Sequence, residues 1–114
     1  MQKTYNGATI SFKRGTVKSR LRGMTLYGKL GVSSDTPNDV MLGYSYFVRL
    51  LTQCEIEGTL GFDLPDTNAD EAVLQAAYQA FMDADEALFD VVMDGLNAVD
   101  EEYQPDALQP GKKN

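Results

Sequence analysis

Histidine and tryptophan are absent from this chain of 114 residues, and cysteine occurs once, as Cys54. Without histidine, the side chain that most often acts as a general base near neutral pH is missing. A single cysteine forms no disulfide within the chain, so we expect a reducing compartment. No apolar run approaches the roughly 20 residues of a bilayer span, and residues 1–11 lack the apolar core of a signal peptide. These absences predict a cytoplasmic protein with no membrane partner.

Charge of one sign is missing from two stretches of the chain. Residues 1–30 hold seven basic residues and no acid, whereas the run at residues 80–102 holds many acids and no base. The net charge is −7, so the acidic part dominates. An asymmetry of this kind indicates electrostatic matching, either within the molecule or with a partner.

The first 30 residues predict a hairpin and a helix. Asn6-Gly7 is a strong signal for a two-residue turn, and Ala8, Ile10 and Phe12 alternate with polar residues as in a half-buried strand. We therefore expect a β-hairpin over residues 2–13. A helix is expected over residues 16–30, with Gly31 at its end, because apolar residues recur there at helical spacing: Val17, Leu21, Met24, Tyr27 and Leu30.

Two further helices are expected after this one. Thr36 is a suitable N-cap with Pro37 at the first helical position, which predicts a helix over residues 37–57 that stops at Gly58. Leu60, Phe62 and Leu64 alternate in the connection that follows.

The longest helix is expected over residues 69–99, begun by a capping box of Asn68 and Glu71. Residues 104–114 contain two prolines and no periodicity, which is typical of a flexible tail. The sequence thus predicts one mainly α domain (small α+β) over residues 1–103, with an N-terminal β-hairpin followed by three principal helices.

An acidic stripe runs along the last predicted helix at spacings of three and four residues: Asp83, Glu86, Asp90 and Asp94. It does not match a calcium loop, because Leu88 occupies the place of the invariant glycine. One interpretation is a solvated face. The other is a partner-binding face that meets a basic surface, either outside the chain or on a basic stripe in the first third: Arg14, Lys18, Arg22 and Lys29.

Signals of catalysis are weak. No nucleophile elbow, phosphate-binding loop or dinucleotide fingerprint occurs, and Cys54 has no visible activating base, so a buried small hydrophobe is the better interpretation of this cysteine. We predict no enzyme activity, no catalytic residue, no metal and no cofactor.

Nucleic-acid binding is possible in principle for the basic first third, where Tyr5, Phe12 and Tyr27 supply rings for stacking. The net negative charge disfavours it, because contacts with phosphate dominate such binding. The reverse hypothesis, an acidic helix that mimics nucleic acid and inhibits a DNA-binding protein, has the right sign of charge.

The run at residues 41–51 is apolar on nearly all sides of a helix. It predicts either a central helix covered by the other elements or an exposed contact site for a partner. The candidate partner-binding residues are Tyr44, Tyr46, Phe47 and Leu50.

Four runs carry a resemblance to a known family: the opening run YNGATISFKRGTVKSRLRG, the two helical runs DVMLGYSYFVRLLTQ and EAVLQAAYQAFMDADEALFDVVMDGL, and PGKKN, which a slippery frameshift site can encode. In their order they resemble the tail assembly chaperones of long-tailed bacteriophages. The resemblance rests on arrangement, and no family signature residue transfers to this chain.

The resemblance implies a non-catalytic protein of the host cytoplasm that binds the tape measure protein, helps to recruit the tail tube protein and self-associates. From the charge layout we further expect copies to dock with the basic first helix against the acidic last helix. The alternatives are the nucleic-acid mimic and another small virion adaptor protein.

Overall fold

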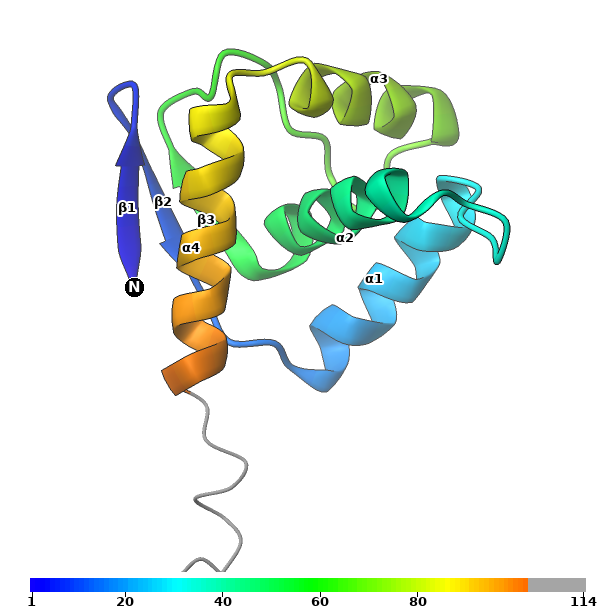
Figure 1. Cartoon of the computed structure of the whole chain (residues 1–114), viewed down its shortest axis with the longest axis horizontal. Helices are drawn as coiled ribbons and strands as arrows, with labels where there is room; N and C mark the ends of the chain where they lie inside the picture. Colours follow the sequence, from blue (N-terminus) through cyan, green and yellow to red (C-terminus); the bar gives the residue numbers. More distant parts are fainter. Residues whose placement is uncertain (103–114) are drawn as a thin grey trace, which may run out of the picture.

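Residues 1–102 are described by a computed structural model of the chain (Figure 1). They form a mainly α structure with a small β part, as the sequence predicts, but the antiparallel sheet has three strands rather than the two of the predicted hairpin. The predicted tail at residues 104–114 lies outside the described residues.

The N-terminal hairpin is confirmed. Strands β1 (Gln2–Tyr5) and β2 (Ala8–Phe12) pair antiparallel, and the turn between them places Asn6 at φ 47° and Gly7 at φ 86°. Positive φ at both central residues is what a type I′ turn requires, and this explains the Asn-Gly pair. Ala8, Ile10 and Phe12 are buried, so β2 points its apolar face into the core.

A third strand, β3 (Cys54–Glu57), replaces the end of the predicted helix 37–57. It pairs antiparallel with β2, with Ile56 opposite Ile10 and Cys54 opposite Phe12. Glu55 and Glu57 point outward while Cys54 and Ile56 point inward, which is the period of a strand. Because a lone hairpin is marginally stable, this third strand gives the sheet the pairing that it needs.

Helix α1 (Val17–Lys29) lies within the predicted range of residues 16–30, one residue shorter at each end. Thr16 and Ser19 form a reciprocal capping box, with the Ser19 N–H donating to Thr16 Oγ1 at 3.1 Å and the Thr16 N–H donating to Ser19 Oγ at 2.8 Å. Gly31 follows the helix at φ 76°, a conformation that glycine adopts without strain.

Helix α2 (Asn38–Gln53) begins one residue later than predicted, after Pro37 rather than Thr36. The Thr36 hydroxyl oxygen accepts a hydrogen bond from the Ser33 N–H at 3.0 Å, so this side chain closes the preceding turn instead of capping the helix.

The predicted helix 69–99 is two helices, α3 (Glu71–Met82) and α4 (Glu86–Glu102). The N-cap of α3 is Asp70 rather than Asn68, since Asp70 Oδ1 accepts from the Val73 N–H at 3.1 Å. Asp85 caps α4, where its carboxylate accepts from the Ala87 N–H at 3.0 Å. The apolar periodicity runs through residues 83–85, but the capping aspartate starts a new helix there.

Helix α2 occupies the centre of the fold. In Figure 1, α1 and α3 lie on opposite sides of α2, and α4 stands between α2 and the sheet. The largest fully buried side chains come from each of these layers: Ile10, Leu26, Phe47, Leu50, Leu74, Leu88, Val92 and Leu96.

Candidate interaction surfaces

Helix α1 is apolar on two opposite sides. On its inner side Gly23, Leu26 and Leu30 are buried against α2, and a Cβ at Gly23 would lie 3.2 Å from Val48 Cγ1, so the glycine allows close packing. The apolar residues that were predicted to form one helical pattern therefore lie on two sides of α1. Leu30 is in the core, whereas Val17, Leu21 and Met24 are on the surface.

On the outer side of α1, three large apolar side chains face solvent. Val17 is 79% exposed, Leu21 58% and Met24 63%. Gly28 continues the row one turn further, with no atom within 4 Å of the place where its Cβ would be. We call Val17, Leu21, Met24 and Gly28 the outer stripe of α1. Its spacing of four, three and four residues is that of the a and d positions of a helix that packs against another helix.

Basic side chains flank the outer stripe. Lys18 and Arg22 lie on one side of it by helical position and Arg20 on the other, and all three are exposed. Within the described part of the chain, none of the three makes an ion pair.

Of the four residues of the predicted basic stripe, Lys18, Arg22 and Lys29 lie on one face of α1, and Arg14 lies outside the helix. Arg14 precedes the capping residue Thr16 and is not part of α1. Lys29 Nζ donates to the Ala69 carbonyl at 3.0 Å and is partly buried, so it ties α1 to the segment before α3.

The predicted acidic stripe is also divided. Asp83 is the C-cap of α3, whereas Glu86, Asp90 and Asp94 lie on the outer face of α4 and are exposed. The opposite side of α4 supplies Leu88, Val92, Leu96 and Val99 to the core.

In residues 1–102, no ion pair joins Lys18 or Arg22 to Glu86, Asp90 or Asp94. Lys18 and Arg22 and the three acids of α4 therefore do not neutralise each other within the described chain. All five side chains are exposed, so a partner of opposite charge can reach them.

The predicted apolar contact site on α2 is wrong for two of its residues. Phe47 and Leu50 are fully buried, because α1, α3 and α4 all pack on α2. Tyr44 and Tyr46 are half-buried. The Tyr44 ring stacks on Tyr78 at 4.1 Å between centroids, and the Tyr46 ring meets the Phe89 ring edge-on at 5.3 Å. These two tyrosines hold α3 and α4 against α2.

A second exposed apolar patch lies where the end of α3 crosses α2. Leu42 is 51% exposed and Met82 45%. Met82 lies over the α2 backbone, since a Cβ at Gly43 would be 2.8 Å from Met82 Sδ. Asp39 lies one helical turn before Leu42 on α2 and Asp83 directly follows Met82, and both acids are exposed. We call Asp39, Leu42, Met82 and Asp83 the α2–α3 corner.

The Tyr78 phenol lies beneath the α2–α3 corner, close to the backbone of Gly43 and at 3.4 Å from the Val40 carbonyl oxygen. Burial raises the pKa of Tyr78, and the nearby Tyr44 and Asp39 raise it further. This corner was not predicted from the sequence; Gly43 within an apolar run is the signal that indicates a close approach of another element.

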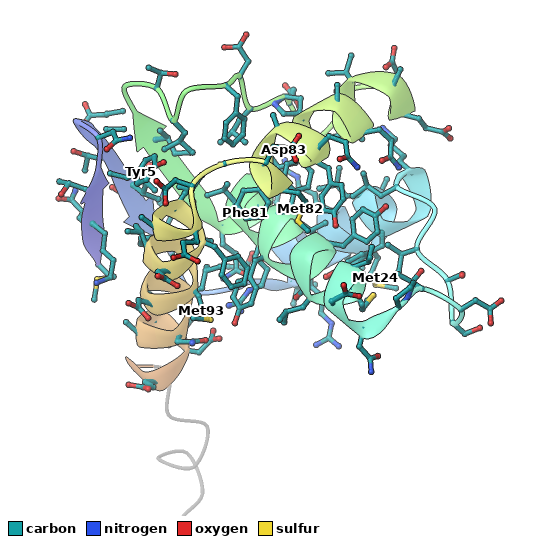
Figure 2. The ribbon with its side chains drawn as sticks, turned by 45° about the horizontal axis from the view of Figure 1, so that its top comes forward. Tyr5, Met24, Phe81, Met82, Asp83 and Met93 are labelled. Atoms are coloured by element: carbon teal, nitrogen blue, oxygen red, sulfur yellow. The ribbon has the colours of Figure 1, made fainter. Side chains whose placement is uncertain are left out.

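Figure 2 shows Met24 on α1 and Met82 and Asp83 at the end of α3, at different places on the molecule. The outer stripe of α1 is basic and apolar, whereas the α2–α3 corner is acidic and apolar. The two surfaces are separate and opposite in charge.

Cys54 and the acidic side chains are the candidate nucleophile and metal ligands of the described residues. Burial raises the pKa of the Cys54 thiol to about 12, which keeps it protonated and unreactive at neutral pH. Among residues 1–102, no group of three or more cysteine and acidic side chains is placed to hold a metal ion.

A hollow of about 500 Å³ between the hairpin and α4 is lined by Gln2, Lys3, Thr4, Thr9 and Val91.

Comparison with models of known protein families, with curated proteins and with solved structures finds no match for this chain. In the described part of the chain, no helix has the length and apolar character needed to span a membrane.

Proposed function

We propose that this chain is a non-catalytic binding protein that shields apolar helical segments of another protein, as a phage tail assembly chaperone shields the tape measure protein. The single observation that carries the proposal is the outer stripe of α1, where Val17, Leu21 and Met24 stand in solvent on one row of a helix. In a monomeric soluble protein, large exposed side chains arranged contiguously mark an interaction site more often than the same side chains scattered singly.

The spacing of the outer stripe favours a helical client. Residues at a and d positions insert between the side chains of a facing helix, and the stripe from Val17 to Gly28 spans about three turns of such a contact. Full burial of a side chain such as Leu21 contributes roughly 1.5–3 kcal/mol, so a docked helix would supply a moderate affinity for each segment. A long client with repeated segments would bind many copies.

The charges beside the stripe favour acidic flanks on the client. Lys18, Arg20 and Arg22 are exposed and make no ion pair within the described residues. Acidic residues on a docked helix would neutralise them, and charge matching of this kind raises the association rate and fixes the register of the pair.

The acidic face of α4 has a different role in this proposal. Glu86, Asp90 and Asp94 are exposed, and no base stands among them on the helix. On a client coated by many copies, this face would keep the complex soluble and repel non-specific contacts.

The acidic face of α4 also supports the alternative function, a nucleic-acid mimic. Its carboxylates recur every four residues, which is about 6 Å along a helix axis, and they face solvent as backbone phosphates do. A nucleic-acid mimic would not account for the exposed outer stripe of α1. We therefore prefer the chaperone function, which does.

Size-exclusion chromatography with a tape measure fragment encoded by the same genome tests the proposal. We expect wild type to co-elute with the fragment and the variant Leu21→Gln/Met24→Gln to elute separately, because glutamine keeps the helix and the charge but removes the apolar contact. Val73→Gln is the matched control: it changes an exposed apolar residue on α3 and should still co-elute. Separate elution of wild type, together with displacement of DNA from a DNA-binding protein, would favour the mimic.

A further inference from the structure

Five of the seven large apolar side chains that the described chain exposes belong to two patches. Val17, Leu21 and Met24 form the outer stripe of α1, and Leu42 and Met82 belong to the α2–α3 corner. Both patches are apolar, and the first is flanked by bases and the second by acids, so their charges are complementary.

We propose that the outer stripe of α1 in one copy docks on the α2–α3 corner of a second copy. This contact covers the surface to which the proposed function assigns the client, so self-association and client binding exclude each other. The docking itself follows from the two patches. The competition with a client rests on the proposed function.

Charge selects the corner over the other surfaces of a second copy. Two outer stripes placed face to face would bring Lys18, Arg20 and Arg22 against the same bases, and like charges in contact are unfavourable. The corner instead offers Asp39 and Asp83.

The acidic face of α4 has the right sign for α1, but it exposes no large apolar side chain. We therefore propose that the first helix docks on the α2–α3 corner rather than on the last helix, as the sequence had led us to expect. The corner combines acids with the exposed side chains of Leu42 and Met82.

The two patches come from different elements, which determines the kind of assembly. The stripe is on α1, and the corner is formed where α3 crosses α2; α1 and α3 lie on opposite sides of α2 (Figure 1). A contact between two different patches repeats from copy to copy, so it closes into a ring or extends as a filament according to the rotation between neighbours. Gly28 leaves open space at the end of the stripe, where a neighbouring backbone can approach closely.

Charge-swapped variants test the docking by light scattering and sedimentation over a range of concentrations. We expect the mass of wild type to rise with concentration and to fall towards one chain in high salt. Lys18→Glu/Arg22→Glu makes both patches acidic, and Asp39→Lys/Asp83→Lys makes both basic, so each variant alone should remain a single chain. An equimolar mixture should assemble again, because each variant then meets a complementary patch on the other.

Circular dichroism establishes that the variants are folded. Leu42→Gln disrupts the corner without a change of charge. Leu42 is exposed, so its substitution leaves the core intact. Wild type that stays a single chain at all concentrations, variants that assemble like wild type, or a mixture that does not assemble would each overturn the docking.

A synthetic helix with leucines at a and d positions and flanking glutamates tests the competition. At a protein concentration where nine-tenths of the wild-type stripes are covered, we expect Leu42→Gln/Met82→Gln to bind this peptide about tenfold more tightly than wild type, because its stripe is free. Equal affinity would overturn the competition. If neither protein binds the peptide while assembly occurs as described, the proposed function fails and the docking stands.

Discussion

The ring of Phe12 on β2 lies directly against the backbone of Gly95 on α4, in the space that a Cβ at position 95 would fill. Phe12 is buried and closes the core between the sheet and α4. This contact holds α4 close to the hairpin.

Gly95→Ala should therefore destabilise the fold, even though alanine is the better helix former. Forcing a methyl group into a filled core costs about 1–3 kcal/mol, more than the roughly 1 kcal/mol gained in helix propensity. Gly28→Ala is the control, because nothing lies within 4 Å of its Cβ position, and it should stabilise the protein by up to about 1 kcal/mol. Urea unfolding at low protein concentration measures both. Equal stability of Gly95→Ala and wild type would contradict the close packing.

Arg49 and Asp100 join α2 to the end of α4. Arg49 donates from Nη2 to both carboxylate oxygens of Asp100, at 2.9 and 3.1 Å, and from Nε to Gln53 Oε1 at 2.9 Å. Because the Asp100 side chain is half exposed, we expect the pair to contribute only about 0.5–1 kcal/mol. A double-mutant cycle of Arg49→Met and Asp100→Asn at low and high salt measures it, and the coupling should shrink as salt is added. A coupling of zero at low salt would show that the pair adds nothing to stability.

Asp85 should matter more to stability than the other acids of the same run. Its carboxylate caps α4, so Asp85→Ala should cost about 1 kcal/mol. Asp90→Ala is the control, since Asp90 lies in mid-helix on the outer face, and its loss should leave stability unchanged or slightly raised. Thermal unfolding of the two variants compares them directly, and a larger loss at Asp90 would refute the assignment of the cap.

Alkaline pH should destabilise the fold through Cys54. Burial raises its pKa from 9.0 to about 12, so the unfolded chain loses this proton at lower pH than the folded protein does. The stabilising contribution is therefore complete below pH 9 and is lost as the pH rises from 9 towards 12, by about 1 kcal/mol per pH unit. Cys54→Ala should show a shallower decline of the free energy of unfolding above pH 9. Parallel curves for the two proteins would contradict the burial of the thiol.

Much of the fold could be predicted from local signals. The Asn6-Gly7 turn, the alternation of Ala8, Ile10 and Phe12, and the glycine after α1 each depend on backbone conformations that few residues favour. The expectation of a helix near the end of the chain also holds for α4, where Leu88, Val92, Leu96 and Val99 recur at helical spacing and are buried.

The errors arise where two structures share one pattern. The short run at Cys54 and Ile56 is compatible with a helix or a strand when the sequence is considered alone. It forms a strand because it pairs with β2, which lies more than 40 residues earlier in the sequence. Likewise, the apolar period continues across residues 83–85, and the capping bond of Asp85 divides the helix there.

The candidate surfaces could be predicted only in part. A row such as Val17, Leu21 and Met24 looks the same in sequence whether it faces the core or a partner, and only the packing of Leu26 and Gly23 on α2 shows that it faces out. The reverse holds for Phe47 and Leu50, which an apolar run offers as a contact site and which the three surrounding helices bury.

The central claim is that the outer stripe of α1 is the working surface of this protein. Its most direct test is backbone amide NMR of the monomeric Leu42→Gln/Met82→Gln variant during titration with an unlabelled tape measure fragment. The account predicts that the resonances of Val17, Leu21 and Met24 shift most. Shifts that concentrate at Glu86, Asp90 and Asp94 instead, with α1 unchanged, would contradict it.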